Sequence, residues 1–487
     1  VWFSRGGWWR NLLMGYVAGF VFFAVTLLWL GGPLAELFGN RWLVCLPILV
    51  AGYLAVFVAA WAWFIGLLPR GDTEFLSSGR NVLIALAAAS AWVALEWVRG
   101  WLFGGFGWNG LGVALHENLA LAQIVDVTGV WGLSFLVAFA NVIALITVRR
   151  FVAEAGRQRI RPHWDFSIMM ASVVGVFAYG VHALQHPVDL PANCVPLRIA
   201  AVQPDIHESD KWSDATARGI YDRYDALTHT ALAWQPQLLI WPEAATLNDL
   251  YEPNTFAWLK SYVADNDTAF LLGSFLSPPN GGEFNIAACL TSRGWAVQIY
   301  RKMHLVPFGE YVPLRHAFPL FAMIAGELVP SDMTAGTEYT VFHLDSPPIR
   351  LAPLICFEDT DGDHCRRFVG PGAGAQLLVN ITNDSWFGKS PGAEQHLANA
   401  FFRAIENRRP LVRDANTGVT CIVDAEGRVQ HSLLNAEGSP FTEGVLFGTV
   451  DVPRDGAVTF YTRYGDWVAH LCAAVLLAVL GFRVARR

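Results

Sequence analysis

Six apolar runs, each near the length that crosses a bilayer, constrain the fold of this chain more than any other feature. A membrane helix needs roughly 20 consecutive apolar residues. Five such runs precede a long segment of ordinary soluble composition, and one follows it. The chain therefore predicts N-terminal transmembrane helices over residues 1–190, a second domain over 196–460, and a C-terminal transmembrane helix with a basic tail over 466–487. The predicted spans are 12–30, 42–68, 81–98, 122–148, 166–184 and 467–484.

The composition supports a membrane location and argues against several functions. Hydrophobic residues make up 54% of the chain and charged residues only 15%, against about 25% charged residues in soluble domains. The net charge of −7 gives no reason to expect nucleic acid as a partner. The seven cysteines form no C-x-x-C pair, and the histidines form no metal-binding spacing such as H-E-x-x-H. We therefore expect neither a metal nor a cofactor.

Basic residues gather on one side of the predicted spans. Five arginines lie between positions 149 and 161, Arg70 and Arg80 flank the loop after the second span, and the tail ends in Arg486 and Arg487. All these regions share one side if the spans alternate, and basic loops stay in the cytoplasm. The segment 196–460 is then expected outside. In a Gram-negative-type cell this means a multi-pass protein of the inner (cytoplasmic) membrane with its large domain in the periplasm.

The outer segment shows strand-like runs that alternate with helical patterns, which is typical of an α/β domain built on central sheets. Three helical patterns fall at 215–234, 255–265 and 392–407. The strand-like runs cover 197–203, 237–241, 269–275, 286–290, 297–300, 349–356, 376–381, 411–415 and 420–423.

Three residues with chemical potential each follow a strand-like run. Glu243 comes after the run that Pro242 ends, because proline cannot continue a central ladder. Lys302 follows the run 297–300 and precedes a loop rich in proline and glycine. Cys356 ends the apolar run 349–356. Taken singly, each has an ordinary explanation: a surface glutamate, a solvated Arg-Lys pair and a buried structural thiol.

Together the three residues suggest covalent catalysis. Attack of cysteine on a carbonyl needs a base that makes the thiolate and a cation or donor that holds the oxyanion. Glu243 can be the base, Lys302 the cation and Cys356 the nucleophile. A neighbouring cation is also expected to depress the pKa of the thiol. The order of these residues in the chain does not by itself bring them together in space.

The motifs around these residues resemble the Glu-Lys-Cys signature of the nitrilase, or carbon–nitrogen hydrolase, superfamily. Together with the multi-span N-terminal part and the single C-terminal span, they narrow the resemblance to the apolipoprotein N-acyltransferase family. The likeness covers nearly the whole chain. It is carried by the segments 201–204 (AVQP), 241–243 (WPE), Lys302, 305–313 (LVPFGEYVP), 356–358 (CFE) and 380–388 (NITNDSWFG).

The resemblance implies an α/β nitrilase-like αββα sandwich and a ping-pong acyl transfer. Cys356 would accept an acyl chain from a phospholipid, by family likeness phosphatidylethanolamine. It would pass the chain to the α-amino group of the diacylglyceryl cysteine of an apolipoprotein. The family usually has eight spans, and this chain begins with Val and shows six. We therefore expect two further spans upstream, which would keep the same orientation.

The resemblance also implies supporting residues. Glu310 and Glu358 would be acids that support the three catalytic residues, although either could be a structural buried acid. Phe357 stands where some relatives have tyrosine, and Trp212 lies where relatives carry a tryptophan on a mobile arm, or is an ordinary core aromatic. The apolar run 316–325 could gate lipid entry or pack on the sheet as a helix. Predicted substrate-binding residues are Trp241, Asn383, Trp386, Phe318, Phe321 and Met323.

Two other functions remain open at this level. A membrane-anchored amidase would use the same three residues with water as the acceptor, but a hydrolase of small soluble amides has no need of six spans. A transporter or receptor with a degenerate nitrilase-like sensor domain would have no use for intact Glu243, Lys302 and Cys356.

Overall fold

The computed structural model describes most of the chain and divides it into two compact units. One unit comprises Val1–Gly31, Trp42–His186 and Tyr464–Arg487, and the other comprises Gly32–Arg41 and Pro187–Arg463. The residues described are 7–37, 39–68, 77–154, 162–187, 191–211, 213–264, 266–279, 281–291, 297–315, 329, 331–454 and 458–485.

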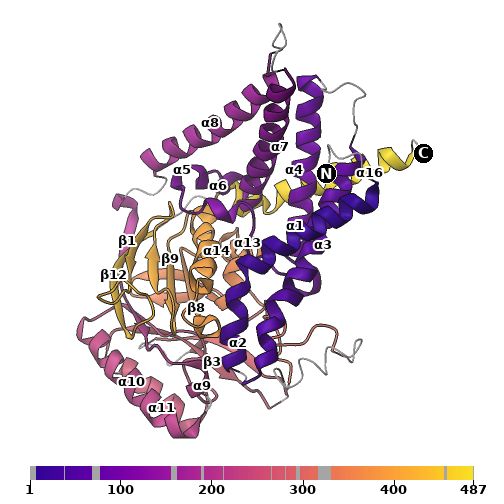
Figure 1. Ribbon diagram of the computed structural model, residues 1–487. Coiled ribbons are helices and arrows are strands. Elements are labelled where there is room, and N and C mark those ends of the chain that lie inside the picture. Colours follow the sequence, from indigo (N-terminus) through magenta and orange to yellow (C-terminus); the bar gives the residue numbers. More distant parts are fainter. Residues whose placement is uncertain are drawn as a thin grey trace. The chain divides into compact units, whose positions relative to one another are not determined.

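The first unit is helical, and six of its described helices are long and apolar enough to cross a membrane (Figure 1). This number agrees with the sequence prediction. The fourth predicted span, 122–148, is interrupted, because Gly129 adopts a left-handed conformation with φ of 62° between α6 (Val125–Thr128) and α7. The long helices are α1 (Trp8–Thr26), α3 (Leu46–Leu67), α4 (Ser78–Arg99), α7 (Val130–Glu154), α8 (Trp164–Gln185) and α16 (Trp467–Ala485).

Small residues let α1 and α3 approach closely. Gly15 and Gly19 are four residues apart and therefore share one face of α1. A side chain at Gly15 would collide with Ala62, and one at Gly19 would collide with Val58, both on α3. Such spacing of glycines is the usual way in which membrane helices gain contact area without large apolar side chains.

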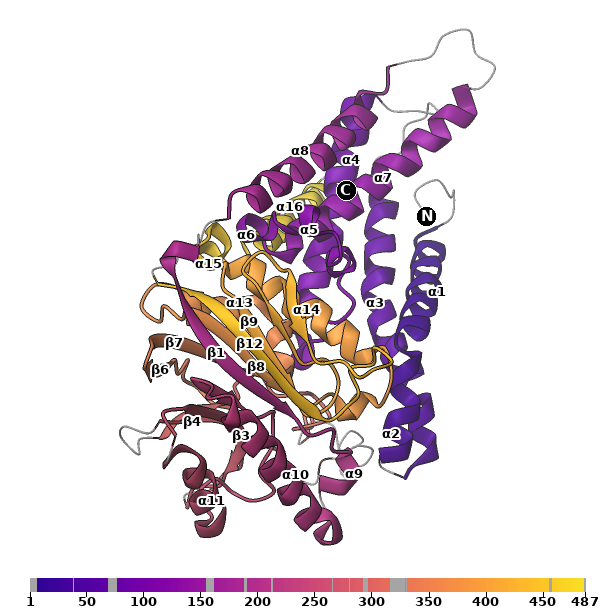
Figure 2. The same ribbon diagram turned by 90° about the vertical axis from the view of Figure 1, so that its left-hand side faces the viewer.

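The second unit holds two six-stranded sheets (Figure 2). In the first sheet the strand order is β12-β1-β2-β3-β4-β5, and in the second it is β11-β10-β9-β8-β7-β6. The strands of the first are β1 (Cys194–Gln203), β2 (Leu238–Ile240), β3 (Ala269–Leu276), β4 (Phe284–Leu290), β5 (Val297–Arg301) and β12 (Gly444–Pro453). Those of the second are β6 (Phe342–Asp345), β7 (Pro348–Ile355), β8 (Leu377–Thr382), β9 (Leu411–Ala415), β10 (Cys421–Val423) and β11 (Val429–Ser432).

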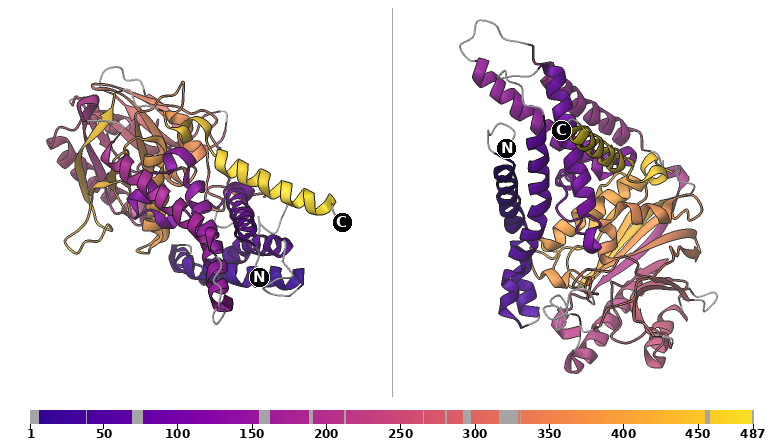
Figure 3. Two further views of the ribbon diagram at one scale, coloured as in Figure 1. Left: turned by 90° about the horizontal axis from the view of Figure 1, so that it is seen from above. Right: turned by 90° about the vertical axis from the view of Figure 1, so that its right-hand side faces the viewer.

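Helices cover the outer face of each sheet, so this unit has the predicted αββα layers. On the first sheet lie α10 (Asp214–Ala233) and α11 (Pro253–Ala264), and on the second α13 (Gly362–Val369) and α14 (Gly392–Asn407) (Figures 1 and 2). The inner faces meet, with β1 against β9 and β4 against β7. Figure 3 shows the sheets from two further sides, with both marked chain ends in the helical unit.

Strand direction brings several loops to one edge of each sheet. In the first sheet β1, β2 and β3 are parallel, and β5 shares their direction because it is antiparallel to β4, which is antiparallel to β3. In the second sheet β7, β8 and β9 are parallel. The carboxyl ends of parallel strands lie at the same edge. The residues that follow β2, β5, β7 and β8 are therefore the natural place for a site.

Candidate active site

Glu243 lies in the loop that follows β2, and close backbone contacts hold this loop in place. The amide of Gly273 on β3 donates to the carbonyl of Pro242 at 3.1 Å, and the amide of Ala245 donates to the carbonyl of Gly273 at 3.0 Å. A side chain at Gly273 would come within 2.6 Å of the Glu243 backbone, so only glycine fits there. These backbone contacts fix the position of Glu243, independently of the contacts that its carboxylate makes.

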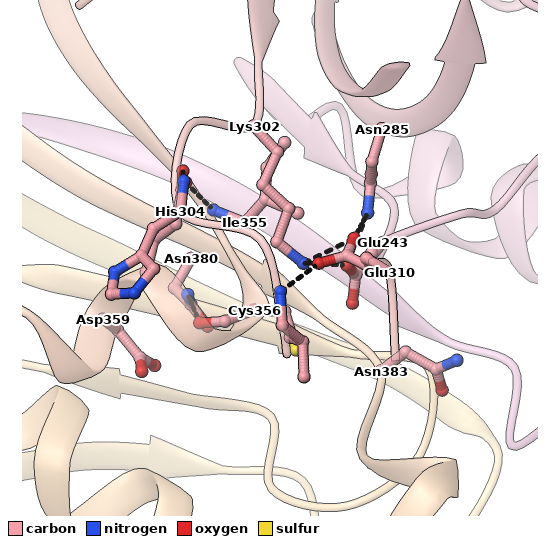
Figure 4. A network of polar contacts seen from close by, with 12 residues as sticks. Glu243, Asn285, Lys302, His304, Glu310, Ile355, Cys356, Asp359, Asn380 and Asn383 are labelled. Atoms are coloured by element: carbon pink, nitrogen blue, oxygen red, sulfur yellow. Dashed lines mark hydrogen bonds and ion pairs between the residues drawn. The ribbon is translucent and has the colours of Figure 1, made fainter. Parts of the chain in front are cut away.

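Lys302 follows β5 and is buried between two carboxylates (Figure 4). Its Nζ lies 3.0 Å from Oε1 of Glu243 and 2.9 Å from Oε2 of Glu310. The Nδ2 of Asn285 on β4 donates to Oε1 of Glu243 at 2.8 Å and to Oε1 of Glu310 at 2.9 Å. The ammonium and one amide thus hold both acids in a fixed arrangement.

The two acids keep the buried lysine charged. Burial by itself would lower the pKa of Lys302, but the carboxylates of Glu243 and Glu310 outweigh it and raise that pKa well above its usual range. A permanently charged ammonium in a site shielded from water can stabilise negative charge that develops on a reacting oxygen.

Cys356 lies at the turn between β7 and the short 3₁₀ helix η6 (Cys356–Thr360), and its backbone is strained. Its φ of 52° falls in the left-handed region, which non-glycine residues seldom adopt. The Nδ2 of Asn380 on β8 donates to the Cys356 carbonyl at 3.1 Å and supports this conformation. Strain of this kind persists only where the surroundings enforce it, and it is commonest at functional sites. The residue stays partly exposed.

Glu358 connects the lysine loop, which follows Lys302, to the cysteine turn, which begins at Cys356. It is fully buried, and its Oε1 accepts hydrogen bonds from the Tyr300 hydroxyl at 2.7 Å and from the amides of Met303 at 2.7 Å and His304 at 3.1 Å. Its Oε2 accepts from the amide of Ile355 at 2.9 Å. One carboxylate therefore fixes the backbone on both sides of the site, next to Lys302 and next to Cys356.

The thiol is protonated at rest. The protein around the sulfur raises the pKa of Cys356 well above its usual range, and the charge of Glu243 raises it further. The charge of Lys302 lowers the pKa of Cys356, but burial and Glu243 outweigh this effect. The sequence-based expectation that a neighbouring cation depresses the pKa of this thiol is confirmed for Lys302, but burial and Glu243 set the net direction. A thiol of this kind needs a base to become a nucleophile, and Glu243 is electrostatically coupled to it.

Behind the cysteine turn lies a buried chain of charged groups. Nε2 of His396 lies 3.0 Å from Oδ1 of Asp359 in η6, and its Nδ1 lies 2.9 Å from Oδ1 of Asp384. Nη2 of Arg413 lies 3.0 Å from Oδ2 of Asp384. Burial would lower the pKa of His396, but Asp359 and Asp384 raise it to about 9, even against the repulsion of Arg413. The imidazolium therefore joins the cysteine turn to the turn that follows β8.

This charge on His396 predicts a pH-dependent stability. The folded protein holds the proton up to about pH 9, whereas an ordinary histidine releases it near 6.5. Between these values the folded state binds more protons, so the free energy of unfolding should fall as pH rises, by on the order of 3 kcal/mol. Thermal unfolding of the detergent-solubilised protein from pH 6 to 10 measures this. The slope should be weaker in His396→Gln and unchanged in His229→Gln, whose side chain is 69% exposed. Equal slopes in all three proteins would contradict the assignment.

Trp241 lies in the hydrophobic core. Its side chain is fully buried, its Nε1 donates to Oγ1 of Thr228 at 3.0 Å, and its ring packs against Tyr224 and Phe270. This differs from the predicted role in substrate binding. The tryptophan precedes Pro242, and its side chain is directed toward the helices that cover the first sheet, so we assign it to packing.

Asn383 lies beside the site as a structural residue, and Trp386 follows it in the turn η7 (Asp384–Phe387). The Nδ2 of Asn383 donates to Oε2 of Glu208 at 2.6 Å, and its Oδ1 accepts from Nδ2 of Asn416 at 2.9 Å. Trp386 is partly exposed. Phe357 is buried, and its ring lies edge-on to that of His304, with 5.3 Å between ring centroids. The predicted residues Trp212, Phe318, Phe321 and Met323 lie outside the described residues, as does the predicted entry gate 316–325.

Sequence reasoning missed three residues that hold the site. Asn285 is a polar residue near the start of an otherwise apolar strand, and that position was the available signal. Asn380 is likewise a polar residue inside an otherwise mostly apolar strand, β8. His396 gave no such signal, because nothing in its local sequence shows that it meets Asp359 and Asp384.

Two family models match successive parts of the chain. Residues 1–143 match the model of the apolipoprotein N-acyltransferase N-terminal domain, and residues 198–458 match that of the carbon-nitrogen hydrolases. The apolipoprotein N-acyltransferase of Geobacter metallireducens is 34% identical over 96% of this chain and 87% of its own length. That of Chlorobaculum tepidum is 33% identical over 91% of this chain and 85% of its own length.

A solved structure also matches: the carbon-nitrogen hydrolase from Helicobacter pylori G27, with a TM-score of 0.39 and 15% identity, over 53% of this chain and 90% of that one. Identity above 30% over nearly the full length of curated relatives, with both family models matched in order along the chain, decides the relationship. The chain belongs to the apolipoprotein N-acyltransferase family, whose catalytic part is a carbon-nitrogen hydrolase domain.

Proposed function

We propose that this protein moves an acyl chain from a phospholipid to the N-terminus of an apolipoprotein through a thioester on Cys356. The donor would be phosphatidylethanolamine, and the acceptor the α-amino group of a diacylglyceryl cysteine. The product is a triacylated lipoprotein. The observation that carries the proposal is the buried ammonium of Lys302, held by Glu243 and Glu310 and coupled to the Cys356 thiol.

In the first half-reaction Glu243 takes the proton of the Cys356 thiol, and the thiolate attacks the ester carbonyl of the phospholipid. The oxyanion of the tetrahedral intermediate is stabilised by Lys302. The intermediate collapses, the ester C–O bond breaks, and the leaving alkoxide takes the proton from Glu243. A lysophospholipid departs and the acyl chain stays on sulfur.

In the second half-reaction the α-amine attacks the thioester. Glu243 accepts a proton from the attacking nitrogen, Lys302 again stabilises the oxyanion, and the C–S bond breaks. The thiolate leaves and recovers a proton from Glu243, so the enzyme returns to its starting state. A thioester is easier to aminolyse than an ester, so the covalent intermediate replaces one difficult transfer with two easier ones.

The membrane helices suit two lipid substrates. The six apolar helices and the family indicate a multi-pass inner membrane protein. We further propose that the catalytic unit faces the periplasm. The basic residues at the ends of α7 and α16 and at the start of α4 support this orientation, because they lie on the side opposite to the point where the chain enters and leaves the catalytic unit.

A chase experiment separates acyl transfer from the amidase alternative. The protein is loaded with phosphatidylethanolamine, freed of excess lipid, and given a diacylated lipopeptide with a free α-amine. We expect rapid loss of the adduct and an equal amount of triacylated peptide. The matched control is the same lipopeptide with an acetylated amine, which should leave the adduct intact. Release of free fatty acid at one rate with either peptide would instead make water the acceptor and the protein a hydrolase.

A further inference from the structure

The register of the second sheet places Thr382 next to the nucleophile. Strands β7 and β8 are parallel, with Leu354 opposite Asn380 and Ile355 opposite Ile381. Cys356 follows Ile355 directly and Thr382 follows Ile381 directly, so the register of the last pair brings the two residues close together. Asn380 and Thr382 are two residues apart on one strand and so share a face of the sheet. The Asn380 side chain on that face already contacts the Cys356 carbonyl.

The hydroxyl of Thr382 is buried and free to donate. The residue has no exposed surface, and its Oγ1 has no oxygen or nitrogen partner among the residues that the structure describes. Its backbone is fixed, since its carbonyl accepts from the amide of Asn416 at 2.9 Å. A buried hydroxyl without a partner is costly, and buried polar groups normally find one. The nearby sulfur can supply that partner once it carries a negative charge.

We propose that Thr382 is a catalytic residue whose hydroxyl donates a hydrogen bond to the Cys356 thiolate. Its role in acyl transfer rests on the proposed function, because the thiolate is the nucleophile of the first half-reaction and the leaving group of the second. One hydrogen bond would therefore assist both. Hydrogen bonds to charged acceptors are about twice as strong as neutral ones, so this contact acts mainly when the sulfur is ionised.

The electrostatics of the site agree with this role. Burial and the charges of Glu243 and Asp384 raise the pKa of Cys356, while Lys302 and the hydroxyl of Thr382 lower it. Glu243 comes from the loop after β2, Lys302 from the end of β5, and Asp384 from the turn after β8. At the sulfur, the negative charges of Glu243 and Asp384 thus raise the pKa and the positive charge of Lys302 lowers it. The Thr382 hydroxyl lowers it without carrying a charge.

The test is the pH dependence of Cys356 alkylation by iodoacetamide, followed by mass spectrometry of the peptide that carries this residue. In Thr382→Val and Thr382→Ala the kinetic pKa of the thiol should rise, so that alkylation near pH 7 slows by about tenfold or more. Thr382→Ser should recover most of the wild-type profile, since it keeps the hydroxyl.

Thr268→Val controls for the chemical change, because Thr268 is also buried but its hydroxyl donates to the carbonyl of Pro236. If the valine variant unfolds, the serine and alanine variants decide the outcome. A wild-type profile in the variants without a hydroxyl, or an equal loss in Thr382→Ser, would overturn the proposal. The assay uses no lipid, so its outcome is independent of whether acyl transfer in the chase experiment succeeds.

Discussion

Lys302→Ala is expected to slow acylation of Cys356 by about a hundredfold or more. The ammonium lies 3.0 Å from Glu243 and 2.9 Å from Glu310 in a buried site, and its removal takes away the cation that we propose stabilises the developing oxyanion. Loss of one oxyanion donor typically costs on the order of 10²–10³ in rate. The measurement is the single-turnover rate at which phosphatidylethanolamine adds an acyl group to the protein.

The matched control is Arg301→Ala, which removes the neighbouring positive charge from an exposed side chain. It should acylate within a few-fold of the wild-type rate. Lys302→Ala also leaves Glu243 and Glu310 buried side by side without their cation, which should lower the free energy of unfolding by about 3–5 kcal/mol. The rates are therefore compared at a temperature where thermal unfolding shows both proteins to be folded. Equal rates in the two variants would remove Lys302 from the mechanism.

Glu358→Gln is expected to abolish most activity and to destabilise the catalytic unit. The two carboxylate oxygens accept from three amides and one hydroxyl in a fully buried position. A glutamine must turn an NH₂ group toward at least one of these donors, which leaves buried donors facing each other. The expected loss is on the order of 3 kcal/mol in unfolding free energy, together with a fall of at least tenfold in acylation rate as the loops that carry Lys302 and Cys356 separate.

Glu443→Gln provides the comparison for Glu358→Gln. Its side chain is 60% exposed and pairs with Arg223 at the surface, where an ion pair contributes little. This variant should unfold at nearly the wild-type temperature. A Glu358→Gln protein with wild-type stability and rate would show that the carboxylate does not hold the two loops.

The membrane helices and the three catalytic candidates were accessible from sequence for simple reasons. A run of apolar residues long enough to cross a bilayer is a local property, so all six long helices were predicted, although α1 ends at Thr26, α3 begins at Leu46 and α7 begins after Gly129. Glu243, Lys302 and Cys356 were identified because each follows a strand, and parallel strands deliver such residues to one edge.

The residues that support the site depend on pairings that no local pattern reveals. Asn285 meets Glu243 and Glu310 only because β4 and β5 pair in one register. Thr382 lies close to Cys356 only because β7 and β8 pair in one register. His396 lies between Asp359 and Asp384, which are distant from it in sequence. The direction of the Cys356 pKa was also inaccessible, since it depends on how closely the protein surrounds the sulfur.

The central claim is that Cys356 carries the acyl chain, and its most direct test is the mass of the protein after incubation with phosphatidylethanolamine. We predict an added acyl group that peptide mapping places on Cys356, sensitive to hydroxylamine as a thioester should be, and absent from Cys356→Ala. A Cys356→Ala protein that still transfers acyl chains from the phospholipid to a diacylated lipopeptide would contradict the covalent mechanism.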